Sequence, residues 1–143
     1  MTRDALFLPV LVQIALTAYA YLRLGAAKKA ASRAGSVDEA RRALHEDAWP
    51  DHVIQINHAI RNQFELPVLF YVLCLMLWAL DAASIAAQAL AWLFALSRIA
   101  HFVEHTGANR VAQRRRPLFT VGAVAVLGLL VLAKLALLGR LLG

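Results

Sequence analysis

The sequence predicts an all-α integral membrane protein, a four-helix bundle that forms one domain over residues 1–143. Hydrophobic residues make up 61% of the chain and mean hydropathy is +0.61, which is more apolar surface than one small water-soluble core can bury. The apolar residues also fall into four long blocks, each near the length that crosses a bilayer. We therefore expect helices at about residues 5–24, 52–80, 82–105 and 118–140.

The first block is predicted to be a membrane helix and not a cleavable signal peptide. It lacks a strongly basic leading segment, and Gln13, Thr17 and Tyr19 interrupt its apolar run. The polar stretch that follows, about residues 25–51, divides in two. Residues 27–35 are expected to be flexible, whereas Ser-Val-Asp-Glu at 36–39 resembles a capping box and predicts a short helix through about His45.

The formal net charge of +6 is distributed as expected for a membrane topology and not for a nucleic-acid-binding surface. Basic residues gather in the first and third loops, whereas the second loop, around Asp81, has no Lys or Arg. The positive-inside bias then predicts cytoplasmic first and third loops and periplasmic termini. The short Ala-, Leu- and Arg-rich chain favours a bacterial inner membrane. The single cysteine, Cys74, lies in an apolar block and is expected to be a small core residue, with no disulfide or metal site.

Polar residues precede the apolar run of the second membrane block at its N-terminal end. The apolar run at residues 66–80 is about 22 Å of helix, short of the roughly 30 Å hydrocarbon core. A spanning helix must therefore carry Glu65, and Arg61 with it, toward the membrane. Ionisable groups at that depth are costly unless they are paired or hold a ligand, so they are candidates for a functional site.

Helical spacing groups the candidates into two faces. Helices two and three are antiparallel, so both faces should lie at the cytoplasmic end and could meet. Pro67 removes a backbone donor just after Glu65 and should kink or loosen its helix there. The two faces are His58, Asn62 and Glu65 at i, i+4, i+7, and Arg98, His101 and His105 at i, i+3, i+7.

These residue types suit a ligand that carries carboxylates and an amine. Arginines recognise carboxylates through a planar fork, an ionised glutamate binds ammonium, and asparagine and histidine add neutral donors and acceptors. A cationic site also lowers the pKa of a thiol bound in it and so generates a thiolate nucleophile.

The same residues resemble the MAPEG family, the membrane-associated proteins in eicosanoid and glutathione metabolism. The segment at residues 58–65, His-Ala-Ile-Arg-Asn-Gln-Phe-Glu, is most similar to the microsomal prostaglandin E synthase branch. Residues 98–101, Arg-Ile-Ala-His, then Gly107 and the loop around Arg114 follow in the order of that family. The resemblance covers about residues 55–130 well and the rest by hydropathy alone.

The resemblance implies a homotrimer that binds glutathione between subunits near the cytoplasmic side. It places Arg61, Asn62 and Glu65 in contact with glutathione and Arg114 near the thiol, where it stabilises the thiolate. Three further pocket residues are implied, Arg98, His101 and His105, the last standing where the family often has a tyrosine.

Two departures from the family pattern bear on the chemistry. Arg115 stands where the synthase branch has a serine, which makes eicosanoid substrates doubtful. The arginine that the family places near the end of helix one has no single counterpart here, because Arg23, Lys28 and Lys29 are all possible.

Each feature also has a simpler interpretation. Arg61 and Glu65 could form a structural i, i+4 pair, and the arginines of the third loop could only contact headgroups. The H-x-x-E-H pattern at residues 101–105 matches inverted zinc peptidases, but no Asp or Glu follows Glu104 as a third ligand, so no metal site is predicted. A haem ligated by His58 with His101 or His105 is disfavoured, because these histidines lie among arginines at the membrane edge.

The prediction is a glutathione-dependent transferase or peroxidase that meets a small lipophilic electrophile through the lipid bilayer. Glutathione is its thiol co-substrate, and nucleic acid is not expected as a partner. The alternative is a catalytically silent family member that serves as a membrane scaffold and binds lipid or a hydrophobic ligand.

Overall fold

The computed structural model describes residues 2–143, and regular structure in this range is entirely helical. Four segments are long and apolar enough to cross a membrane: Arg3–Arg33, Asp51–Ala79, Ile85–Thr106 and Val111–Leu142. The predicted all-α fold with four membrane helices is therefore confirmed. In chain order the elements are η1 (Arg3–Leu6), α1 (Phe7–Arg33), η2 (Glu46–Ala48), α2 (Asp51–Arg61), η3 (Asn62–Phe64), α3 (Leu66–Ala79), α4 (Ile85–Thr106), η4 (Val111–Arg115) and α5 (Arg116–Leu142).

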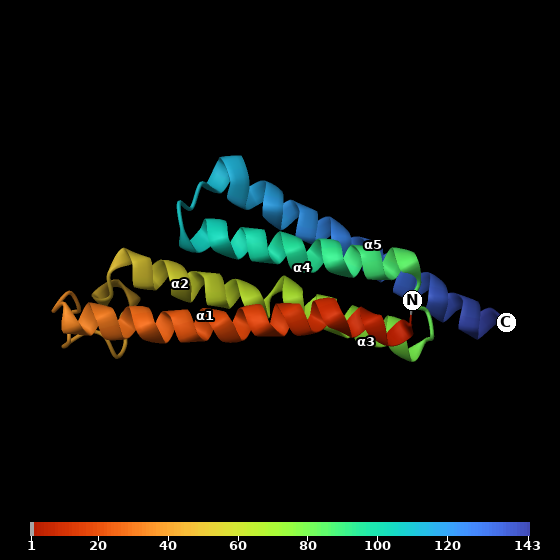
Figure 1. The fold of residues 1–143 in the computed structure, drawn as a ribbon, viewed down its shortest axis with the longest axis horizontal. Coiled ribbons are helices and arrows are strands. Elements are labelled where there is room, and N and C mark those ends of the chain that lie inside the picture. The colour runs from red at the N-terminus through yellow and green to blue at the C-terminus, as the bar shows by residue number, and fades with distance from the viewer. Residues whose placement is uncertain (1) are drawn as a thin grey trace.

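The helices run side by side along the long axis of the molecule (Figure 1). α4 and α5 form one pair, and α1 lies along α2 and α3. Both termini and the α3–α4 turn lie at one end, whereas the α1–α2 loop and the α4–η4 connection lie at the other. The two basic loops therefore share one end of the bundle, as the charge pattern predicted.

Small residues allow the helices to approach closely. Gly122 of α5 faces α4 so closely that a Cβ there would lie 3.0 Å from the Ser97 hydroxyl. Phe70 and Phe94 stack at 4.3 Å between ring centroids, and Cys74 is buried in the same core as expected. Tight backbone approach through small residues is how helices associate where lipid removes the hydrophobic driving force.

α1 continues well beyond the predicted end at residue 24, so the expected flexibility of residues 27–35 is wrong. The Ala- and Lys-rich sequence there has high helix propensity. The helix ends at Arg33 in a Schellman motif, with Gly35 at φ +65°. The Ser36 amide donates to the Ala31 carbonyl at 3.1 Å and the Gly35 amide to Ser32 at 3.1 Å.

The short helix predicted from Ser36 to His45 is a run of turns. Ser36 is used to end α1, and its hydroxyl donates to the Ala31 carbonyl at 3.1 Å. The Asp38 carboxylate accepts from the Ala40 amide at 3.1 Å, and the amides of Arg42 and His45 close single turns. An Asp that bonds its own following backbone favours a turn over helix initiation.

The second membrane segment is broken, where one helix was expected over residues 52–80. α2 ends at Arg61, η3 forms a single tight turn, and Glu65 adopts φ −99° and ψ −102° before α3 begins. Pro67 lies in the first turn of α3, where its missing N–H costs nothing. The predicted irregularity at this proline is confirmed, and it is a break and not a bend.

The third and fourth membrane helices lie close to their predicted positions. Asp81 at φ +58° turns the chain after α3, and the Ser84 hydroxyl caps α4 by accepting from the Ala87 amide at 3.2 Å. The fourth segment begins earlier than residue 118, because the π-helical turn η4 precedes α5. This turn brings several arginines against the bundle.

Candidate functional site

Arg98 of α4 connects to the break in the second membrane segment. Its side chain is fully buried, and Nη2 donates to the Asn62 carbonyl at 3.0 Å. Its Nε and Nη1 have no hydrogen-bond partner among the described residues, and the guanidinium lies 6.0 Å from the Phe119 ring centroid. The two faces that helical spacing defined are therefore brought together at the break.

His101 and His105 continue this face of α4 toward the loop end. Both are buried, and their rings meet edge to face with centroids 5.6 Å apart. His101 also approaches Phe119 of α5 at 6.1 Å, and Nδ1 of His105 has no hydrogen-bond partner among the described residues. The histidines thus present unused polar atoms between α4 and its neighbours.

Two cavities lie along these residues. The one at the helix break, which we call the break pocket, has a volume of about 410 Å³. A second, the mouth pocket, has about 530 Å³ and lies at the loop end. Arg115 lines both. The break pocket is formed by Asn62, Glu65, His101, Val111, Arg115, Arg116, Phe119 and Thr120, and the mouth pocket by Asp51, Ile54, Gln55, His58, His105, Gly107, Ala108, Asn109 and Arg115.

The arginines of the third loop point in different directions. Arg115 is half-buried and its Nη1 donates to the Asn109 side-chain oxygen at 3.1 Å. Arg114 instead lines a separate cavity of about 480 Å³, together with Ala100, Val103 and Glu104. The sequence candidate Arg114 therefore lies apart from Asn62 and Glu65, whereas Arg115 and Arg116 line the break pocket with them.

A set of hydrogen bonds fixes the connection that carries these arginines. Glu104 accepts from the backbone amide, Nε and Nη2 of Arg110, each at 2.9 Å. Gln55 of α2 donates to the carbonyls of His105 at 2.6 Å and Gly107 at 3.2 Å. The glutamate of the H-x-x-E-H pattern is thus bound to Arg110, and over residues 2–143 no three His, Cys, Asp or Glu side chains group to hold a metal ion.

Arg61 is engaged by a residue that the sequence pattern did not indicate. Its Nη2 lies 2.7 Å from Oε1 of Glu46, which also accepts from the side-chain amide of Asn57. Nε2 of His58 lies 3.5 Å from the other Glu46 oxygen. The alternative i, i+4 pair of Arg61 with Glu65 does not form, because α2 ends at Arg61.

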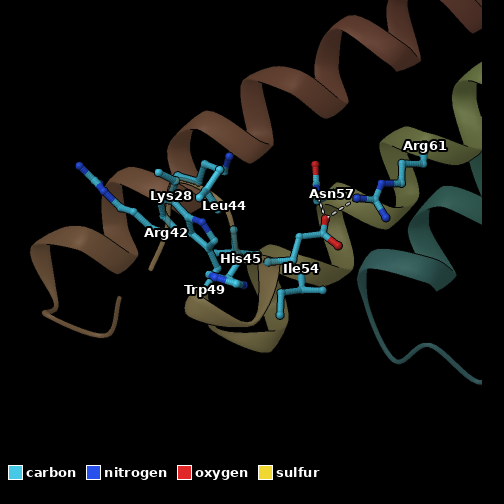
Figure 2. Close-up of a pocket in the computed structure, with 11 residues that line it drawn as sticks. Lys28, Arg42, Leu44, His45, Trp49, Ile54, Asn57 and Arg61 are labelled. Carbon is cyan, nitrogen blue, oxygen red and sulfur yellow. Dashed lines mark hydrogen bonds and ion pairs between the residues drawn. The ribbon is translucent and has the colours of Figure 1, made fainter. Parts of the chain in front are cut away.

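Glu46 belongs to a hollow of about 260 Å³ under the α1–α2 loop (Figure 2). Figure 2 shows Asn57 and Arg61 on the α2 side of the hollow, with Trp49 on the loop and Lys28 on α1. Partial burial opposes ionisation, but the hydrogen bond from Asn57 and the charge of Arg61 outweigh it and hold the pKa of Glu46 below its ordinary value of 4.5. The loop carboxylate is therefore ionised at neutral pH.

The three basic residues of α1 that could be the counterpart of the family's helix-one arginine lie in different places. Arg23 reaches α4, where its Nη1 donates to the Thr106 hydroxyl at 2.6 Å. Lys28 lies over the Trp49 ring at 4.9 Å from its centroid and lines the hollow around Glu46. Lys29 is exposed. None of the three lines the break pocket.

Comparison with known proteins identifies the family. Neither a curated protein nor a solved structure matches this chain significantly. The model of the MAPEG family matches residues 6–135, which include the second and third membrane segments in full, most of the first and fourth, and every residue of the break pocket. The chain belongs to the MAPEG family.

Proposed function

We propose that this protein is a glutathione-dependent transferase or peroxidase that acts on lipophilic electrophiles within the membrane. The observation that supports this most strongly is the break pocket, where Asn62, Glu65, His101 and Arg115 line one cavity at the helix break. Glutathione transferases and peroxidases occur in the family to which the chain belongs. The proposal includes the resemblance of residues 58–65 to the prostaglandin E synthase branch, but it does not include the substrate of that branch.

The break offers complementary groups to a peptide thiol. The Glu65 carboxylate suits the ammonium group, and the guanidinium groups of Arg61 and Arg98 suit the carboxylates, with Asn62 supplying an amide. His101 and His105 add neutral donors or acceptors along the same face. Because the helix is interrupted at residues 62–65, backbone groups are also available to the ligand there.

Chemistry begins when the bound thiol loses its proton to water in the open pocket. A guanidinium from the arginine turn, residues 114–116, stabilises the thiolate that remains. In the transferase reaction the sulfur bonds to an electrophilic carbon, and the leaving group departs with its electron pair. In the peroxidase reaction the sulfur takes the distal peroxide oxygen, an alcohol leaves, and a second glutathione converts the sulfenic acid to disulfide and water.

The proposal includes an assembly and an orientation. A homotrimer in a bacterial inner membrane, with the two basic loops in the cytoplasm, brings water-soluble glutathione to the loop end. The electrophile then arrives laterally from lipid. The clustering of Arg and Lys at that end supports this orientation.

The proposal is tested by titrating detergent-purified protein with glutathione and following thiolate absorbance in the near ultraviolet. Saturable absorbance is expected in the wild type. Glu65→Gln should lose it because the ammonium contact is lost, and a trimer with normal helical circular dichroism would show that the variant is folded. Absence of thiolate in a folded wild-type protein would refute the proposed activity.

A catalytically silent scaffold that binds lipid is the second candidate. It is favoured by the contact between Arg61 and Glu46, since the guanidinium expected to bind the ligand already has a carboxylate partner. A silent protein would remain trimeric and bind lipid with no thiolate signal at any glutathione concentration.

A further inference from the structure

We propose that Arg115, and not Arg114, supplies the positive charge that stabilises the thiolate in this protein. This inference rests on the proposed thiol chemistry and names the residue that performs it. It departs from a position-by-position reading of the family pattern, in which Arg114 has this role and residue 115 is a serine.

The first argument is position. Arg115 lines the break pocket with Asn62 and Glu65, and it lines the mouth pocket with His58 and His105. A thiol peptide that enters from the loop end and reaches the helix break must pass its guanidinium. Arg114 lines neither cavity, and Arg116 lines only the break pocket.

The second argument is charge. Over residues 2–143, no carboxylate lies within ion-pair distance of Arg115, and its one recorded side-chain partner is the neutral Asn109 amide at 3.1 Å. Its positive charge is therefore available to an anion. Arg114 shares its cavity with Glu104, and a thiolate placed there would face that carboxylate as well.

The third argument is the π-helical turn. The Arg115 amide donates to the Arg110 carbonyl five residues back at 3.0 Å, and the Arg114 amide donates to the same carbonyl at 3.1 Å. The Arg110 amide in turn donates to the Glu104 carboxylate, which fixes the start of the turn. With this turn in place, Arg115 lines the break pocket together with Val111 and Phe119, whereas Arg114 lines the separate cavity beside Glu104.

The chemistry requires no additional base. The thiol S–H bond breaks, the proton passes to water in the open pocket, and the electron pair stays on sulfur beside the Arg115 guanidinium. Because the charge favours only the ionised form, its removal should raise the pKa of the bound thiol and leave binding of the rest of the peptide largely intact.

The experiment compares thiolate absorbance and peptide affinity in four trimeric, detergent-purified variants beside the wild type. The variants are Arg115→Ala, Arg115→Lys, Arg114→Ala and Arg140→Ala, the last a control at the opposite end of the bundle. Affinity is measured with S-methylglutathione, which has no thiol proton. A pH titration of the absorbance gives the pKa of the bound thiol.

We expect Arg115→Ala to raise the pKa of the bound thiol by about one unit or more, a roughly tenfold loss of thiolate at neutral pH. S-methylglutathione affinity should change much less. Arg115→Lys keeps the charge and should recover part of the thiolate, which a purely structural role would not predict. Arg140→Ala should match the wild type.

Normal thiolate in Arg115→Ala would overturn the inference, and loss in Arg114→Ala alone would return the role to that residue. Either result leaves the proposed function standing, because the wild type still forms thiolate. A wild type without thiolate would instead refute the proposed function.

Discussion

Glu46 joins the α1–α2 loop to α2 through three side chains, those of Asn57, His58 and Arg61. His58 belongs to one of the two faces from which the proposed thiol site is built, and Arg61 precedes Asn62 of that face. A carboxylate in this position offers Arg61 the same group that a peptide ligand would offer. At the level of single residues, the loop would therefore compete with the proposed peptide ligand for Arg61.

Acid should release this contact. The folded pKa of Glu46 lies below 4.5, so its ionised form stabilises the loop above about pH 4.5, and this contribution is lost as pH falls through the folded pKa. We expect the fluorescence of nearby Trp49 to change in that acid range in the wild type and to be flat in Glu46→Gln. Glu39→Gln, which alters another carboxylate of the same loop, is the control and should behave as wild type. An unchanged transition in Glu46→Gln would contradict the assignment.

Two features of the helices as elements position the site, namely the break before α3 and the close packing of α4 on α5. The break turns Asn62 and Glu65 out of a regular helical register and toward α4. Close packing at Gly122 holds α5, and with it the arginine turn, against α4. Both features should respond to single substitutions.

Pro67→Ala should weaken ligand binding without unfolding the protein. An alanine restores an N–H that can donate to the residue-63 carbonyl, so α2 and α3 can join into one helix and rotate Asn62 and Glu65. We expect roughly tenfold weaker binding of S-methylglutathione by calorimetry, as misplacement of site groups by about 1 Å is costly. Ala79→Gly, at the other end of α3, is the control, and equal affinity in Pro67→Ala and wild type would show that the break is not needed.

Gly122→Leu should destabilise the α4–α5 pair by about 1–3 kcal/mol, the usual cost of overpacking. A Cβ at this position already lies 3.0 Å from the Ser97 hydroxyl and 3.6 Å from Phe94. Gly139→Leu is the matched control, because a Cβ there meets nothing within 4 Å. Thermal unfolding followed by near-ultraviolet circular dichroism should separate the two, and equal midpoints would show that α5 can move away freely.

For the whole molecule, four membrane segments return the chain to its starting side. Both termini lie at one end and both basic loops at the other (Figure 1). The positive-inside bias predicts that the loop end faces the cytoplasm. The proposed delivery of glutathione depends on this orientation, because the mouth pocket lies at the loop end.

Cysteine labelling tests the orientation. Leu44 in the first loop is 90% exposed and Leu142 near the C-terminus 86%, whereas the native Cys74 is buried and should give little background. A membrane-impermeant maleimide should label Leu44→Cys in inverted inner-membrane vesicles and Leu142→Cys in intact spheroplasts. The reverse pattern would place the thiol site on the periplasmic side and contradict the proposed delivery route.

The sequence by itself determined the membrane class, the four segments and the family, and it singled out Asn62, Glu65, His101 and His105, which line the two cavities. Hydropathy is a property of each segment by itself, so the length and composition of a segment alone predict that it crosses the bilayer. Helical spacing on α4 and the proline after Glu65 are likewise local, which is why the convergence of Asn62 with Arg98 at an irregular helix was predictable.

Only the tertiary structure decided that Arg115 and Arg116, and not Arg114, line the break pocket, and what Arg61 contacts. The position of Arg115 depends on a π-helical turn that is held by the hydrogen bond from Arg110 to Glu104. The partner of Arg61 lies in a loop 15 residues earlier. The long α1 and the turns after it were missed because Ser36 ends one helix and does not begin another. The local sequence preferences of these residues are compatible with several arrangements. Tertiary packing therefore determines which contacts form.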